Sequence, residues 1–166
     1  MLIVDDESGV RFALSEALRS WGYDSVQAGT VADAIKLFSE EHPAVALLDI
    51  DLPDGSGLDI MNEIKEQQPD TVVIIITGNV NVPNVVTALR GGAHDFISKP
   101  IHLEELRITL RNALETRELR REVQLARRER VQAFGFEQIL GESPAMKKAM
   151  DLARRVAASD VTAILL

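Results

Sequence analysis

The sequence predicts an α/β fold: a five-stranded parallel sheet with helices on both faces, extended by a long helix. Three observations support this fold class. Short, continuously apolar runs alternate with helical patterns through the first hundred residues, which is typical of a parallel sheet built from β-α units. Acidic residues directly follow two of these runs, at the strand ends where such sheets bind ligands. From Leu103 to Ala133 neither glycine nor proline interrupts a helical pattern, so a long helix is expected there.

Five runs are predicted to be strands because each is short, largely apolar and bounded by turn or helix signals. The clearest is Val72–Ile76, five β-branched residues in a row, a composition that favours strands. In chain order the predicted strands are Leu2–Val4, Ser25–Ala28, Val45–Leu48, Val72–Ile76 and Asp95–Ser98. Their apolar residues are mostly continuous and not alternating, so both faces of the sheet are expected to be buried.

Between the strands, apolar residues recur at three- and four-residue spacing, which predicts helices. Glycine or proline ends each pattern: the first at Gly22, the second before Pro43, the third before Pro69 and the fourth at Gly91. Thr30 is expected to cap the second helix. Each predicted strand is therefore followed by a helix, as the fold class requires.

The composition excludes several classes of protein. Among 166 residues there are no cysteines and only 3 histidines, which excludes disulfides, thiol catalysis and cysteine metal sites. Residues 1–103 hold 16 acidic and 6 basic side chains, a poor match for nucleic acid and a better one for a divalent cation or a basic partner. The apolar runs are too short for a membrane span, and the first residues lack signal-peptide features. We therefore expect a cytoplasmic protein with no membrane partner.

Polar residues gather where the predicted strands end. Asp5, Asp6, Asp49, Thr77 and Lys99 each follow or close a strand, and the carboxyl ends of parallel strands share one edge of the sheet. Carboxylates a few ångströms apart repel by roughly 1–4 kcal/mol per pair, so a cation is expected there. Oxygen ligands without histidine or cysteine favour Mg²⁺. Each residue alone is commonly a turn or helix cap, but the set together predicts a site for Mg²⁺ and a phosphoryl group.

Four segments resemble the motif set of bacterial response-regulator receiver domains, which have a flavodoxin-like fold. The segments are Leu2–Glu7, Leu47–Pro53, Ile76–Gly78 and Asp95–Pro100. The resemblance covers essentially residues 1–115 and implies a response regulator of a two-component phosphorelay. It implies that Asp49 accepts a phosphoryl group from the phosphohistidine of a sensor histidine kinase. Mg²⁺ would be held by Asp5, Asp6, Asp49 and the backbone carbonyl of Asp51.

The resemblance also implies how the site works and how it signals. Lys99 and Mg²⁺ would neutralise charge on the phosphoryl oxygens, and the Lys99–Pro100 peptide bond would be cis. Thr77 would move to bond the phosphoryl group while Phe96 turns inward, so both are expected to be switch residues. The chain would then be a phospho-accepting regulatory domain that catalyses its own phosphotransfer and dephosphorylation, and not an enzyme. A group of valines is a further candidate contact surface: Val80, Val82, Val85 and Val86.

Residues 116–135 are predicted to be a linker helix continuous with the last receiver helix. Leu119, Val123 and Ala126 form a thin apolar stripe at four- and three-residue steps, which indicates a homodimer through the receiver and linker helix. The alternative is a solvated helix stabilised by Glu–Arg pairs.

Residues 136–166 are similar to the opening of the AAA+ module of NtrC-type, sigma-54-dependent activators. The similar segments are Phe136–Met146 and Ala157–Thr162. The phosphate-binding pattern G-x-x-x-x-G-K-[ST] does not occur in the sequence, so this segment is not expected to bind ATP. Sigma-54 RNA polymerase and DNA are expected to be contacted only through domains outside these residues.

Two other functions remain open at this point. The chain could be a pseudo-receiver, a dimerisation or binding module that acts without phosphorylation, or a phosphatase with an aspartyl nucleophile. The complete set of five site residues argues against the first. The short loops argue against the second, because such phosphatases carry a substrate-capping insertion. Whether phosphorylation relieves repression or promotes assembly is also open.

Overall fold

A computed structural model describes the backbone of residues 1–78, 82–133 and 143–157. The chain divides into two compact units, Met1–Leu119 and Arg120–Leu166, and each is described by itself. The predicted boundary between receiver and linker at residues 115 and 116 stays a prediction. No helix among the described residues is both long enough and apolar enough to cross a membrane.

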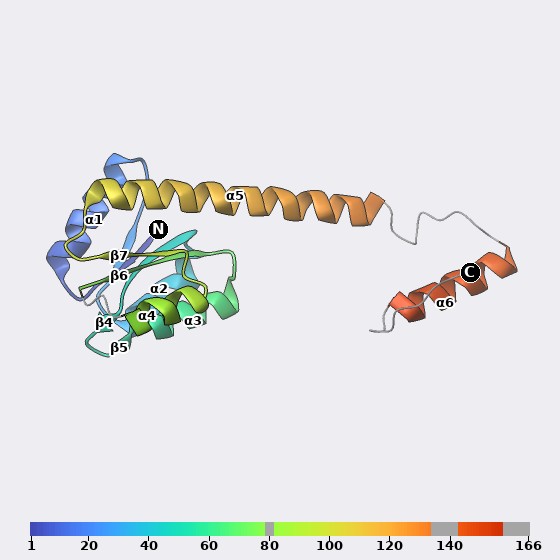
Figure 1. Ribbon diagram of the computed structural model, residues 1–166, viewed down its shortest axis with the longest axis horizontal. Coiled ribbons are helices and arrows are strands. Elements are labelled where there is room, and N and C mark those ends of the chain that lie inside the picture. The colour runs from blue at the N-terminus through green and yellow to red at the C-terminus, as the bar shows by residue number, and fades with distance from the viewer. Residues whose placement is uncertain (79–81, 134–142, 158–166) are drawn as a thin grey trace. The chain divides into compact units, whose positions relative to one another are not determined.

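The first unit is built on a parallel five-stranded sheet with the strand order β2-β1-β3-β6-β7 (Figure 1). All five predicted strands are confirmed to within one residue at either end. Their observed bounds are β1 Leu2–Val4, β2 Val26–Ala28, β3 Val45–Asp49, β6 Val72–Thr77 and β7 Asp95–Ser98. A two-stranded antiparallel hairpin, β4 (Asp51–Leu52) and β5 (Gly55–Ser56), was not predicted.

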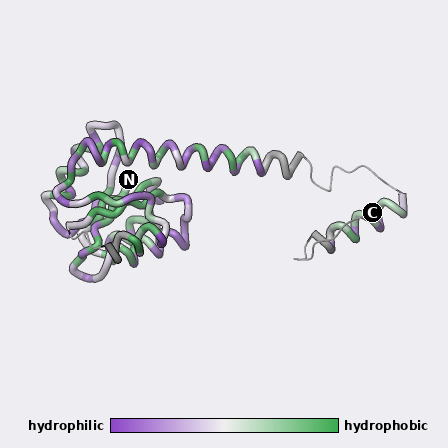
Figure 2. The backbone as a smooth tube through the Cα atoms, in the orientation of Figure 1, coloured by the Kyte–Doolittle hydropathy of each residue, from purple (hydrophilic) through white to green (hydrophobic). Residues whose placement is uncertain are grey.

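Helices cover both faces of the sheet, as predicted. The helices of this unit are α1 Ser8–Ser20, α2 Val31–Glu41, α3 Gly57–Gln67, α4 Val82–Arg90 and the first part of α5 Leu103–Ala133. A further helix, α6 Pro144–Ala157, belongs to the second unit. The cluster containing Ile3, Leu14 and Leu110 packs α1 and α5 on one face. A second cluster, which includes Phe38 and Ile64, packs α2, α3 and α4 on the other (Figure 1). The strands between them are the most hydrophobic part of the unit (Figure 2).

The helix boundaries follow local chemistry. The Thr30 hydroxyl accepts the amide N–H of Asp33, so the predicted cap of α2 is confirmed. Gly22 adopts φ +86° just after α1, a left-handed conformation that favours glycine. In the second unit the Ser143 hydroxyl accepts the N–H of Met146 at the start of α6. The predicted segments 136–142 and 158–166 lie outside the described residues.

The long helix α5 begins at Leu103 as predicted and is described to Ala133, while residues 134–135 of the predicted linker helix lie outside the described residues. Its character changes along its length. Leu106, Leu110 and Ala113 are buried against the sheet. Leu119 and Val123 are 62% and 52% exposed, so the predicted stripe is exposed, while the dimer it would form stays a prediction. Among the valines proposed as a contact surface, Val86 is exposed; Val80 and the side chains of Val82 and Val85 lie outside the described residues.

Candidate functional site

The sheet brings the predicted residues together at one edge. Asp5 follows β1, Asp49 ends β3, Thr77 ends β6 and Lys99 follows β7. The parallel register holds this arrangement, since Asp49 pairs with Ile76 and Thr77 pairs with Ser98. The peptide bond between Lys99 and Pro100 is cis, as predicted.

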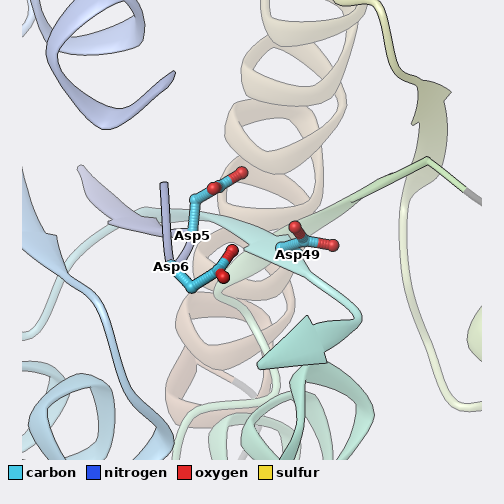
Figure 3. A group of neighbouring side chains, drawn as sticks. All are labelled: Asp5, Asp6 and Asp49. Carbon is cyan, nitrogen blue, oxygen red and sulfur yellow. The ribbon is translucent and has the colours of Figure 1, made fainter. Parts of the chain in front are cut away.

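Three carboxylates meet at this edge. One oxygen each from Asp5, Asp6 and Asp49 lies within 4.8 Å of the others, and the side chains surround one space (Figure 3). Asp5 and Asp49 are buried, whereas Asp6 is exposed. The cluster is therefore reached from solvent on the Asp6 side.

Lys99 is the cation that faces these acids. Its Nζ lies 2.6 Å from Asp49 Oδ2, 2.8 Å from Asp5 Oδ2 and 3.5 Å from Glu7 Oε1. Burial alone would lower the pKa of Lys99, but hydrogen bonds and charges from Asp49 and Asp5 outweigh it and raise the pKa above its ordinary value. The side chain is therefore positively charged throughout the physiological pH range.

The surroundings of Asp5 indicate whether these three carboxylates could hold a metal ion. Burial raises its pKa, although Lys99 and the N–H of Glu7, which donates to Oδ1 at 2.9 Å, act in the opposite direction. Asp5 Oδ2 is fully buried, and the Lys99 ammonium lies 2.8 Å from it. Three carboxylates against one ammonium leave two negative charges uncompensated. Two buried carboxylates, a third at the surface and this excess of negative charge suit a hard divalent cation such as Mg²⁺.

The remaining predicted residues lie at or near the cluster. The N–H of Asp51 donates to Asp49 Oδ1 at 3.3 Å, while its carbonyl as a metal ligand stays a prediction. Thr77 is 1% exposed. Phe96 is half-buried and packs against the core cluster under α2, α3 and α4. Their roles as switch residues stay predictions.

Gly57 is a residue of the site that the sequence analysis missed. A Cβ at this position would overlap the carbonyl oxygen of Asp49 and lie 2.8 Å from its carbonyl carbon. The Gly57 N–H also donates to the carbonyl of Ile50 at 3.0 Å. The first residue of α3 is thus packed directly against the backbone of Asp49. Glycine and serine at residues 55–57 are typical of a turn, but the close approach to Asp49 appears only in three dimensions.

Comparisons with known proteins agree with this geometry. Residues 1–111 match the family described as the response regulator receiver domain. The regulatory protein AtoC of Escherichia coli is 32% identical over 165 residues, covering 99% of this chain and 36% of AtoC. The chain spans about a third of the length of the curated relatives it matches.

Solved structures of receiver domains are also similar to this chain, and some of them match residues beyond the receiver domain. A crystal structure of NtrX from Brucella abortus is 33% identical with a TM-score of 0.73, covering 95% of this chain and 34% of that one. The solution structure of a beryllofluoride-activated NtrC4 receiver domain dimer is 39% identical with a TM-score of 0.67, covering 70% of this chain and 96% of that one. The predicted resemblance to receiver domains of NtrC-type regulators is confirmed.

Proposed function

This chain belongs to the family of response regulator receiver domains, and we propose that it accepts a phosphoryl group on Asp49 from a sensor histidine kinase in a Mg²⁺-dependent reaction. The observation that carries this proposal is the meeting of Asp5, Asp6 and Asp49 with Lys99 at one sheet edge. No comparable group of residues supports the two alternatives, a pseudo-receiver and a phosphatase with an aspartyl nucleophile, within the described part of the chain.

In the proposed reaction an Asp49 carboxylate oxygen attacks the phosphorus of a phosphohistidine. A P–O bond forms as the P–N bond breaks, and the electron pair stays on the imidazole nitrogen. Asp5, Asp6 and Asp49 would hold Mg²⁺, together with the backbone carbonyl of Asp51, and the ion would supply charge neutralisation on the phosphoryl oxygens. Lys99 is already within hydrogen-bond distance of Asp49, so its ammonium needs only a small shift to bond a phosphoryl oxygen.

Hydrolysis of the acyl phosphate at the same site would return Asp49 to its carboxylate. The chain would thus catalyse its own phosphotransfer and dephosphorylation without acting on a separate substrate. Thr77 is buried at the end of β6, next to the strand that carries Phe96. We infer that Thr77 bonds the phosphoryl group and that Phe96 moves with it, which carries the change toward α4 and β7.

The proposed output is control of the dimer state, and through it the ATPase of a sigma-54-dependent activator. The exposed Leu119 and Val123 support a homodimer through receiver and linker helix, and the related NtrC4 receiver is described as a dimer. Contacts with sigma-54 RNA polymerase and DNA would be made by parts of the relatives that this chain does not span, and ATP would not be bound by residues 136–166. We propose the cytoplasm as the site of action.

The test is incubation of the full chain with acetyl phosphate and Mg²⁺, followed by intact mass measurement. The wild type is expected to gain the mass of one phosphoryl group, and chelator is expected to abolish the gain. Asp49→Asn is expected to gain nothing. Asp59→Asn is the matched control, because it changes an exposed aspartate on α3 in the same way.

Equal labelling of Asp49→Asn would overturn the choice of Asp49, and labelling in excess chelator would overturn the role of Mg²⁺. An unlabelled wild type that still dimerises would favour the pseudo-receiver instead.

A further inference from the structure

Arg11 turns back from α1 onto the loop that carries Asp5 and Asp6. Its Nη1 donates to the carbonyl oxygen of Asp5 at 2.6 Å and to that of Asp6 at 2.9 Å. Hydrogen bonds from an ionised donor are roughly twice as strong as neutral ones. One guanidinium therefore stabilises the backbone of both acidic residues through their carbonyl oxygens.

Gly29 lies on the other side of this guanidinium. A Cβ at Gly29 would lie 3.1 Å from Arg11 Nη1 and 3.5 Å from Cζ, so the guanidinium occupies the space that glycine leaves open. The preceding residue, Ala28, ends β2 and accepts the N–H of Asp5 at 3.2 Å. Arg11 thus sits between the acidic loop and the end of β2.

The carboxylate of Asp5 depends on this local backbone. Its Oδ1 accepts the N–H of Glu7 at 2.9 Å, so the loop sets the direction of the side chain. Within the described residues, Glu7 makes no side-chain capping bond at the start of α1. The two carbonyl bonds from Arg11 therefore tie the loop and the first turn of α1 together.

We propose that Arg11 is a positioning residue of the Mg²⁺ site: by holding the carbonyls of Asp5 and Asp6, it keeps both carboxylates directed at Asp49. The inference rests on the proposed function, because it presupposes that Mg²⁺ binds there. Two possible roles for Arg11 predict opposite changes in Mg²⁺ affinity when its side chain is removed. A nearby positive charge repels Mg²⁺, so removing a mere charge would strengthen binding. Removing a group that orients the ligands weakens binding, typically by about 10- to 100-fold.

The test is calorimetric titration of the full chain with MgCl₂. Arg11→Gln is expected to bind Mg²⁺ at least about 10-fold more weakly than wild type. Arg11→Lys, which retains a charged donor, is expected to recover part of the affinity. The matched control is Arg19→Gln on the same helix. It removes the same charge from a side chain that is 81% exposed and pairs with Glu16 at 3.8 Å. This variant is expected to bind Mg²⁺ like wild type.

Gly29→Ala gives an independent variant, because its Cβ crowds the guanidinium without removing it; it too is expected to bind Mg²⁺ more weakly. If Arg11→Gln fails to fold, this variant decides the question, and wild-type affinity in it overturns the inference. Equal or tighter binding by a folded Arg11→Gln also overturns the inference, while Mg²⁺ binding by wild type leaves the proposed function intact. If wild type itself does not bind Mg²⁺, the proposed function fails and the inference with it.

Discussion

The ammonium of Lys99 lies 2.6 Å from Asp49 Oδ2, although fifty residues separate them in the chain. The same ammonium lies 2.8 Å from Asp5 Oδ2, so one cation joins the ends of β1, β3 and β7. Lys99 provides a positive charge that the two buried carboxylates need. Mg²⁺ bound as proposed would compete with this ammonium for the same oxygens.

Lys99→Ala is expected to lower the free energy of unfolding by about 1–3 kcal/mol without Mg²⁺, because two buried acids lose their partner. Added Mg²⁺ should stabilise this variant more than wild type, since the competing cation is gone. Urea denaturation with and without MgCl₂ measures both effects. Lys36→Ala, at an exposed position on α2, is the control, and an equal Mg²⁺ effect in wild type and Lys99→Ala would contradict the competition.

Gly57→Ala is expected to destabilise the protein by about 1–3 kcal/mol, because its Cβ overlaps the backbone of Asp49. It should also reduce phosphoryl labelling, since relief of the overlap displaces the acceptor. Gly9→Ala is the matched control: it lies within α1, and apart from its own turn of helix no described residue has an atom within 4 Å of the added Cβ. It should stabilise the protein by up to about 1 kcal/mol. Denaturation midpoints and intact mass check the two effects, and unchanged stability in Gly57→Ala would refute the clash.

Asp54 ties the hairpin after Asp49 to the start of α2. Its carboxylate accepts the N–H groups of Val31 at 2.8 Å and Ala32 at 3.2 Å, and the bond from Val31 is the main cause that lowers the pKa of Asp54. A lowered folded-state pKa gives stability that is present above the ordinary pKa and lost as pH falls through the lowered one.

Asp54→Asn is therefore expected to be less stable than wild type at neutral pH, with the difference shrinking as the pH falls below about 4. Denaturation curves across this range measure it, with Asp59→Asn as the exposed control. A difference that is independent of pH would show that the carboxylate charge is not responsible.

The five strands and the meeting of Asp5, Asp6, Asp49 and Lys99 at one edge could be predicted because each depends on a pattern that the sequence displays directly. Val72–Ile76 is unbroken β-branched sequence, and residues that follow parallel strands must share an edge, which brought Lys99 and Asp49 together correctly. The hairpin of β4 and β5 was missed because strands of two residues leave no room for a hydrophobic pattern. Gly57 and Arg11 were missed because both act on backbone carbonyls, and a carbonyl is present at every position of a sequence.

The apolar stripe on α5 predicts an association through Leu119 and Val123, which lie one turn apart on the same face. Leu119→Gln combined with Val123→Gln should shift the chain toward monomer in sedimentation experiments, as should truncation after Leu114. Leu125→Gln is the control, because Leu125 is similarly exposed, at 48%, but lies on another face of the helix. Unchanged association in the double variant would favour the solvated helix with Glu–Arg pairs.

The last prediction concerns how a phosphoryl group at Asp49 affects β7 and α4. Thr77 is buried at the end of β6, and β7 beside it carries Phe96. A phosphoryl group adds about 1.5–2 negative charges and three acceptor oxygens, and a hydroxyl donor that moves toward them leaves space behind it. An allosteric response requires that the mimic favour one of two states. Beryllofluoride is thus expected to change hydrogen exchange across residues 86–98 in wild type.

Thr77→Ala is expected to bind beryllofluoride but to show a smaller change across residues 86–98, because the donor that links site and strand is missing. Thr71→Ala is the matched control: Thr71 is also buried but immediately precedes β6, about 20 Å from Thr77 at roughly 3.3 Å per residue. Its response to the mimic should equal that of wild type at matched stability. If Thr77→Ala responds fully, the phosphoryl signal leaves the site without this hydroxyl, and Lys99, which connects β1, β3 and β7, becomes the better candidate for the path.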